Sequence, residues 1–322
     1  MKGKTKPSKR STSRAKKAKS VLRRRQCGTM SVHNRLLEQY PSYRQNLVDI
    51  ERLVARRMVS GIAARTGGPV TIPVVVHVVF NTASENISDA QIKSQIAVLN
   101  KDYRAKNTDR NKTPAVWRGL VTDVNIVFAL ASKDPSGNPT AGVTRTLTTH
   151  TSFSDDNSVK SAATGGADPW PSGKYLNIWV CTFERTPTGQ LLGYAQFPGG
   201  PPATDGVVIL NTAFGTKGTA AAPFNRGRTS THEIGHWLNL HHIWGDTAHC
   251  EGTDLVDDTP NQQLPNFGKP HFPHITCSNG PNGDMFMNYM DYVDDDSMFM
   301  FTTGQVTRMT ATLDGPRSTI GT

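Results

Sequence analysis

The stretch THEIGHWLNLHHIWGD, residues 231–246, constrains the fold of this 322-residue chain more than any other. His232 and His236 lie four residues apart, so on a helix they share one face about one turn apart. Two imidazoles at this spacing can bind one Zn²⁺, and Glu233 lies where its carboxylate can act as general base on a metal-bound water. From HEIGH alone, an exposed helix with an incidental histidine pair remains an equal alternative.

The residues after HEIGH indicate which further histidine can reach the same metal. On an unbroken helix, His242 would lie roughly 15 Å along the axis from His232, too far to share one ion. The helix therefore has to turn back, and Asn239 is a residue type that tolerates the left-handed backbone conformation of such a turn. The pattern HExxHxxNxxH then predicts His242 as the third ligand, a positive φ at Asn239, and His241 pointing away from the metal.

The elements around this motif predict an α+β fold, a twisted sheet with helices packed on it. A helix is expected after Ser88, with Ser88 as N-cap and Gln91 completing a capping box. A Gly-rich stretch at 60–69 marks a domain boundary, and regular structure becomes sparse after residue 246. The other expected elements are strands at 71–80, 124–131, 174–183 and 206–213, a helical segment at 29–58 interrupted at Pro41, and a helix at 303–314.

The charge of the chain is concentrated in its first residues. Residues 1–25 contain 12 Lys or Arg and no Asp or Glu, so the rest of the chain, with 24 basic and 26 acidic residues, has a formal charge of −2. Such a tail is expected to be disordered, either as a solvated, cleavable leader or as a segment that binds nucleic acid or an anionic surface. The chain as given shows no stretch that could span a bilayer and no apolar core of a secretory signal.

A separate motif, DMFMNYMDY at residues 284–292, is rich in methionine and strengthens the metal interpretation. Together with the histidine motif, it resembles the metzincin clan, whose pattern is HExxHxxGxxH, although Asn239 replaces the glycine. The run HEIGHWLNLHHIWGD…C…DLVDDTP…C…MNYMDY resembles in particular the pappalysin family, over residues 232–309 and more loosely from residue 71. The resemblance implies a metzincin-like zinc endopeptidase with a mixed sheet, a backing helix, an active-site helix and an irregular C-terminal subdomain.

The same resemblance assigns further residues. It implies that Met290 forms the Met-turn beneath the zinc, with Met285 and Met287 as alternatives, and that the Tyr292 hydroxyl binds the zinc or stabilises the oxyanion. It also implies a disulfide between Cys250 and Cys277, whose alternative is two free thiols. The remaining implied groups are a calcium site at Asp254, Val256 and Thr259, for which an Asp-rich turn is the alternative, and an acidic pocket for arginine at P1′ formed by Asp294, Asp295 or Asp296, for which a solvated acidic turn is the alternative.

The segment around Cys27, RRRQCGT, resembles the inhibitory segment of pappalysin-like zymogens, in which a thiolate occupies the open position of the zinc. An inert thiol is the alternative. The expected organisation is a basic tail and inhibitory pro-segment at 1–60 and a catalytic domain at 61–322, divided near residue 242 into upper and lower subdomains. We expect a secreted monomer that acts on proteins or peptides, with Zn²⁺ and Ca²⁺ bound. The competing hypothesis is a catalytically silent zinc or calcium domain that binds proteins.

Overall fold

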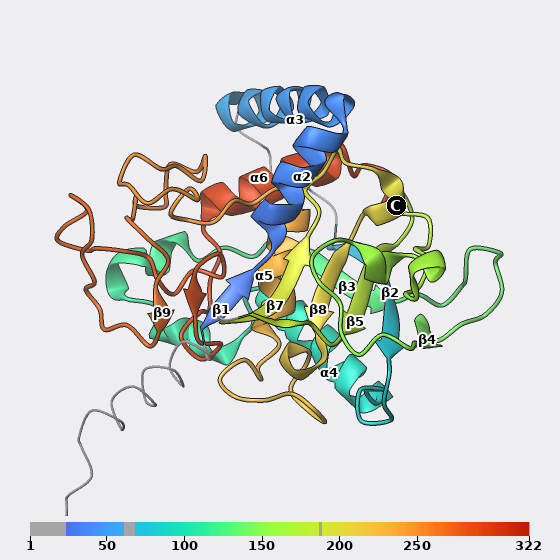
Figure 1. Cartoon of the computed structure of the whole chain (residues 1–322). Coiled ribbons are helices and arrows are strands. Elements are labelled where there is room, and N and C mark those ends of the chain that lie inside the picture. The colour runs from blue at the N-terminus through green and yellow to red at the C-terminus, as the bar shows by residue number, and fades with distance from the viewer. Residues whose placement is uncertain (1–23, 61–67, 187–188, 322) are drawn as a thin grey trace, which may run out of the picture.

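The computed structural model describes residues 24–60, 68–186 and 189–321, and Figure 1 shows their arrangement. An eight-stranded sheet crosses the molecule, with strand order β1-β7-β8-β5-β2-β3, while β4 pairs with β2 and β6 with β7. Its strands are β1 (Arg25–Cys27), β2 (Val70–Phe80), β3 (Ile126–Leu130), β4 (Val143–Leu147), β5 (Leu176–Cys181), β6 (Arg185–Thr186), β7 (Gly189–Ala195) and β8 (Val207–Leu210).

The sheet is mixed, as predicted. Strand β2 pairs in parallel with β3, β4 and β5, and β5 pairs in parallel with β8, whereas β7 runs antiparallel to β8. The sequence VTIPVVVHVVF forms β2 because its β-branched side chains fill both faces of a buried strand. Val74 and Val76 enter the main core cluster on one face, while Val75 and Val79 pack on the other.

Three helices pack against the sheet and the C-terminal part of the chain: α4 (Asp89–Asp102), α5 (Arg228–Trp237) and α6 (Thr303–Asp314). Ser88 caps α4 by accepting a hydrogen bond from the Gln91 amide, as expected. The predicted capping box at Gln91 is wrong, however, because Oε1 of this fully buried side chain accepts from the amide and hydroxyl of Thr219, while its Nε2 donates to the carbonyls of Asn211 and Phe214. These loop carbonyls need a donor inside the protein, and Gln91 provides it. The described residues also include the 3-10 helices Thr108–Lys112, Ala115–Leu120, Ser158–Lys160, Ala162–Thr164, Pro202–Thr204 and Asn211–Ala213.

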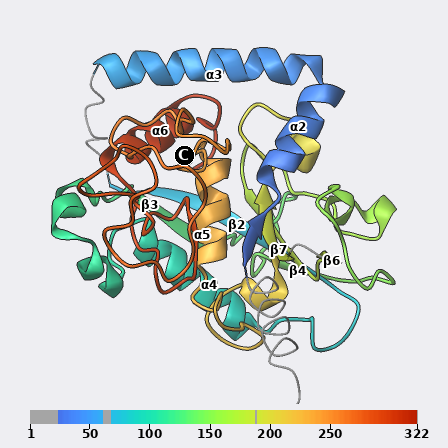
Figure 2. The ribbon, with the colours of Figure 1, turned by 60° about the vertical axis from the view of Figure 1, so that its left-hand side comes forward.

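Residues 24–60, which we call the N-terminal segment, run from β7 up to the top of the molecule as it is drawn in Figures 1 and 2. The segment consists of β1, helix α2 (Thr29–Gln39) and helix α3 (Pro41–Ser60), with Pro41 at the first position of α3. Figure 2 shows β1 beside β7 and α5, while α3 runs over α6. The prediction of a disordered tail through residue 25 is wrong at Arg25, which is 1% exposed because Asp295 compensates its charge. Residues 1–23 of that tail lie outside the described residues.

The chain after α5 is irregular, as predicted, and a covalent link holds it. A disulfide joins Cys250 and Cys277, which confirms that pairing, and closes a separation of 27 residues. On the chain-entropy model such a link stabilises the fold by roughly 3 kcal/mol. The only strands after α5 in the described part of the chain, β9 (Phe267–Gly268) and β10 (Tyr292–Val293), pair with each other. None of the described helices is long and apolar enough to cross a bilayer.

Candidate metal centre and active site

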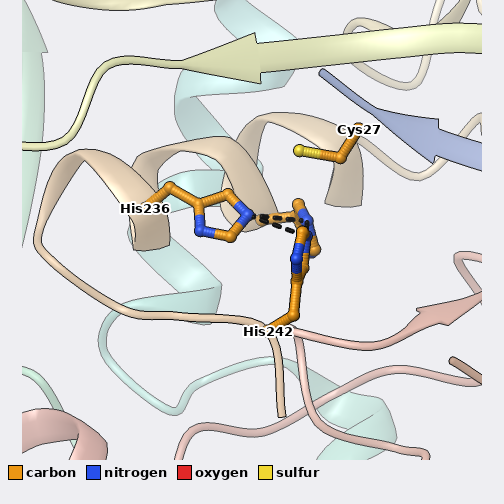
Figure 3. Close-up of side chains that lie close together, drawn as sticks. Cys27, His236 and His242 are labelled. Carbon is orange, nitrogen blue, oxygen red and sulfur yellow. Dashed lines mark hydrogen bonds between the residues drawn. The ribbon is translucent and has the colours of Figure 1, made fainter. Parts of the chain in front are cut away.

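Helix α5 carries the first part of the site and then ends abruptly. All ten of its residues are buried, among them His232, Glu233 and His236. The chain turns back at Asn239, whose φ is 72°, and the Leu240 amide donates to the carbonyl of Gly235. Asparagine tolerates this left-handed conformation better than most residues. The turn brings His242 back to the imidazoles of the helix, as Figure 3 shows for His236 and His242.

The three imidazoles meet through their Nε2 atoms. These nitrogens are 3.2 Å apart between His232 and His236, 3.3 Å between His232 and His242, and 3.0 Å between His236 and His242. Ligands of one tetrahedral Zn²⁺, each at 2.0–2.1 Å, are expected roughly 3.3 Å apart. His241 does not join them, and its ring stacks on Phe197 instead.

The partners of the Nδ1 atoms decide what the Nε2 atoms can do. Nδ1 of His232 contacts the Tyr289 carbonyl and Nδ1 of His236 the Leu240 carbonyl, each at 2.7 Å. A carbonyl can only accept, so both Nδ1 atoms carry the proton; burial lowers the pKa of both histidines, which keeps the rings neutral. Their Nε2 atoms, which dashed lines join in Figure 3, therefore point lone pairs at each other. A bound cation would relieve this repulsion.

His242 completes the group with a different orienting partner, because its Nδ1 lies 2.6 Å from Oδ1 of Asp246. Neutral nitrogen ligands in a tetrahedral arrangement suit zinc. The donor set and its spacing thus fit the predicted metal.

Glu233 lies beside this group, 1% exposed, and its Oε2 accepts a hydrogen bond of 3.0 Å from the Thr29 hydroxyl. Burial raises the pKa of Glu233 to about 7. The approach of β7 to this side chain requires glycine at position 193, because a Cβ there would lie 2.8 Å from Cγ of Glu233. Sequence analysis missed Gly193, since β7 has no regular hydrophobic alternation that would have located it.

Cys27 approaches the imidazoles from the N-terminal segment. It is the last residue of β1, which pairs in parallel with β7, and its Sγ lies within 4.8 Å of all three histidine ligand atoms. The thiol also donates to Oε2 of Glu233 at 3.2 Å. Burial, followed by the charge of Glu233, raises the pKa of this thiol. A zinc ion would reverse this preference and favour the thiolate.

Met290 and Tyr292 flank the histidines on other sides. Met290 is fully buried below α5, and a Cβ on Gly235 would lie 2.5 Å from its Sδ. The ring of Tyr292 packs against those of His232 and His242, with centroids 5.7 and 5.0 Å apart. Met290 thus packs against α5, and Tyr292 packs against two of the predicted ligand rings.

The side chain of Arg25 is buried next to the site, and we call its surroundings the Arg25 pocket; they are formed by Thr229, Val293, Asp295 and Phe224. Its guanidinium donates to Oδ1 of Asp295 at 2.6 Å, to the Thr229 hydroxyl at 3.1 Å and to the Val293 carbonyl at 3.3 Å. The group also lies 5.0 Å from the ring centroid of Phe224. Each of the three guanidinium nitrogens therefore has a partner, which a single ammonium group could not reproduce.

The three predicted specificity aspartates have different surroundings. Asp295 is fully buried, and its Oδ2 accepts from the backbone amides of Arg226 and Arg228. Asp296 pairs with Lys269 at the surface, and Asp294 is partly exposed. The sequence offered no way to rank the three, because only the fold sends one of them into the pocket.

The predicted calcium residues also come together. Both carboxylate oxygens of Asp254 and the Val256 carbonyl lie 2.8–2.9 Å from the Thr259 hydroxyl. One hydroxyl proton cannot satisfy three acceptors, so the group has an excess of oxygen lone pairs. Burial raises the pKa of Asp254 to about 7. Hard oxygen donors with this excess suit Ca²⁺.

The fold and the site define a zinc metalloendopeptidase, and comparisons with known proteins agree. The profile of the family described as pregnancy-associated plasma protein-A matches residues 160–314. An extracellular metalloprotease of Pyricularia oryzae is 32% identical over 264 residues, which cover 80% of each chain, and one of Colletotrichum graminicola is 32% identical over 302 residues, 91% of each. The chain belongs to the pappalysin family. The relatives' names agree with the predicted location outside the cell.

Solved structures extend this relationship. The mature mirolysin of Tannerella forsythia, in complex with a cleaved peptide, is 50% identical with a TM-score of 0.76; the match covers 79% of this chain and 96% of mirolysin. A point mutant of T. forsythia promirolysin is 44% identical with a TM-score of 0.82, over 92% of this chain and 96% of the other. The match to the precursor form thus covers more of this chain than the match to the mature form.

Replacing Gly235 with alanine tests the packing of Met290 below the site. We expect Gly235→Ala to lower the free energy of unfolding by about 1–3 kcal/mol, because the new methyl group overlaps the sulfur. Gly119→Ala is the matched control, since a Cβ there would meet nothing within 4 Å. Denaturant unfolding of both variants decides the question, and equal stability would mean that Met290 does not support α5.

Proposed function

We propose that this zinc endopeptidase hydrolyses peptide bonds with Glu233 as general base and that its N-terminal segment keeps it latent through Cys27. The observation that carries the proposal is the position of Oε2 of Glu233, which Cys27 contacts beside the three facing imidazole nitrogens. The same carboxylate that would activate water is thus covered by the segment. A silent binding domain would have no need of a buried carboxylate at this position.

His232, His236 and His242 would hold the zinc, which supplies Lewis-acid polarisation of water and of the scissile carbonyl when bound. Glu233 takes the proton of the attacking water and delivers it to the leaving amine. Tyr292, whose ring packs against those of His232 and His242, donates a hydrogen bond from its hydroxyl to the developing oxyanion.

Latency is supported by the path of the N-terminal segment. Strand β1 occupies the edge of β7 next to α5, where an extended substrate would otherwise add to the sheet. In the zinc-loaded protein the Cys27 thiolate would fill the position that the catalytic water needs. We therefore assign residues 1–60 to an inhibitory pro-segment and residues 61–322 to the catalytic domain, with its two subdomains meeting near residue 242.

A preference for arginine at P1′ is supported by the pocket that holds Arg25. The pocket lies beside the metal centre and ends at the buried carboxylate of Asp295, so an arginine of a substrate could replace that of the segment. Asp294 and Asp296 lack a comparable position, and we assign the specificity to Asp295.

Calcium is proposed for the group formed by Asp254, Val256 and Thr259. The support is its excess of buried oxygen lone pairs, which a divalent cation would satisfy. The ion would stabilise the irregular chain between α5 and α6.

Removing the general base tests the mechanism. Once the N-terminal segment has been removed, Glu233→Ala should hydrolyse a protein substrate about 10²–10⁴-fold more slowly, since general-base catalysis contributes this much. Metal analysis is the control, because the three histidines remain and the variant should keep its zinc. Hydrolysis at the normal rate would refute the mechanism.

Removing the proposed inhibitory thiol tests latency. The uncleaved Cys27→Ala chain should hydrolyse a fluorogenic peptide, whereas uncleaved wild type should not. Cys181→Ala is the matched control, because Cys181 is the other free cysteine of the described chain and is buried away from the site in β5. Intact mass spectrometry identifies uncleaved chains, and a Cys27→Ala chain as silent as wild type would contradict the proposal.

The specificity proposal predicts a selective loss. Asp295→Asn should lower kcat/KM for peptides with arginine at P1′ by about 100-fold or more, because an arginine would be buried there without a counter-charge. Peptides with leucine at P1′ should change much less. Asp296→Asn removes the surface carboxylate of the next residue, which pairs with Lys269, and serves as the control. An arginine preference that survives Asp295→Asn would sink the assignment.

Calcium should raise the thermal stability of the full-length chain. At free Ca²⁺ 100 times its Kd, the expected stabilisation is about 2.7 kcal/mol. Asp254→Asn should abolish this increase, while Asp257→Asn, an exposed aspartate in the same loop, should retain it. Differential scanning calorimetry measures both, and an undiminished calcium effect in Asp254→Asn would locate the ion elsewhere.

A further inference from the structure

The N-terminal segment makes a second contact away from the cleft, where α3 lies on α6 (Figure 2). Ile50 and Val54 of α3 pack with Ala311 of α6 in a small core cluster of their own. Leu53 fits over Gly315, at which a Cβ would lie 2.2 Å from the leucine Cδ2. The contact therefore has an apolar centre that is separate from the two larger core clusters.

An ionic group lies beside this apolar contact. Oε1 of Glu51, on α3, accepts from Nη2 of Arg308 at 2.5 Å and from Nδ2 of Asn239 at 3.0 Å. The Nε of Arg308 donates in turn to the carbonyl of Asn239 at 2.7 Å. Arg308 and Asn239 are each 1% exposed, so both polar groups depend on partners inside the protein.

The two charged side chains of this group differ in exposure, and the difference favours retention of α3. Glu51 is partly exposed, and water can solvate it when α3 leaves. Arg308 belongs to α6 and remains behind, with the neutral carbonyl of Asn239 as a hydrogen-bond partner. When α3 leaves, Arg308 therefore loses the carboxylate that pairs with its charge, and this ion pair favours the bound state of α3.

We propose that the surface formed by Asn239, Arg308, Ala311 and Gly315 is an exosite for an amphipathic helix that carries a carboxylate. In the zymogen α3 occupies it, and it holds the N-terminal segment in addition to the contacts of Arg25 and Cys27 in the cleft. The inference rests on the proposed latency and adds a second attachment to it. Helix α2 joins the two contacts, so each raises the effective concentration of the other.

The exosite acts next to the zinc-binding turn, because Asn239 is the residue at which the chain reverses before His242. Its side chain binds Glu51 and its carbonyl binds Arg308. Glycine at this position would permit the turn but could not bind α3 through a side chain. The consequence is that cutting the connection between α3 and β2 does not by itself release the segment, which stays bound at two sites.

The test compares two substitutions on α3 in the zinc-loaded, full-length chain. Glu51→Gln removes the charge that compensates Arg308. Asp49→Asn is the matched control, because the Asp49 carboxylate is exposed and contacts Gln45 and Arg52 of its own helix. Both changes lie on a peripheral helix, so neither endangers the folding of the sheet.

The first readout is the rate at which iodoacetamide alkylates Cys27 in uncleaved chains. Peptide mass spectrometry measures the alkylated fraction over time. We expect Glu51→Gln to react about tenfold faster than wild type and Asp49→Asn to react like wild type. Hydrogen exchange of the α3 amides is the second readout and should accelerate only in Glu51→Gln. Alkylation at the wild-type rate in Glu51→Gln would overturn the proposal, even if exchange in α3 became faster, since α3 would then not help to hold Cys27.

These readouts do not require the protein to be an active enzyme. If Cys27→Ala releases activity while Glu51→Gln leaves alkylation unchanged, the exosite fails and the latency mechanism stands. If Cys27→Ala stays silent, the latency mechanism fails on its own experiment.

Discussion

The structure depends on three buried imidazole Nε2 atoms that converge on one point. This arrangement is held from outside the site, because each Nδ1 is bound by a group on a different part of the chain: the Tyr289 carbonyl, the Leu240 carbonyl and the Asp246 carboxylate. The end of α5, the reversal at Asn239 and the irregular C-terminal chain all have to be in place before the nitrogens converge. A cation that binds them therefore joins segments that have little regular structure between them.

The N-terminal segment contacts several parts of the proposed active site. The thiol of Cys27 approaches the metal ligands, Arg25 fills the pocket of Asp295, and β1 adds to the edge of β7. Each of these three contacts involves a different element of the proposed active site. At the opposite side, α3 contacts the turn at Asn239 from behind, so that the segment meets the zinc-binding loop on two faces.

Patterns within short stretches predicted most of the regular structure. The β-branched run of β2, the N-cap Ser88 and the helix that ends the chain were found because their signals are local. Strands β1 and β7 were missed, because RQC and GQLLGYA carry no clear alternation and become strands only by pairing with each other and with β8. Gln91 was misassigned for a related reason, since its partners lie more than a hundred residues away.

By itself the sequence predicted that His232, His236 and His242 converge and that the chain turns at residue 239, because spacing along one helix and the conformational range of asparagine are local properties. Its assignment of Glu233 as general base stays a prediction. It also pointed, through family resemblance, to the disulfide of Cys250 and Cys277. Only the tertiary structure decided which of three neighbouring aspartates enters a pocket, that Arg25 occupies it, and that Glu51 reaches Arg308 across 257 residues of sequence. Burial and charge compensation between distant segments select these contacts, and neither property can be read from residues that are adjacent in the chain.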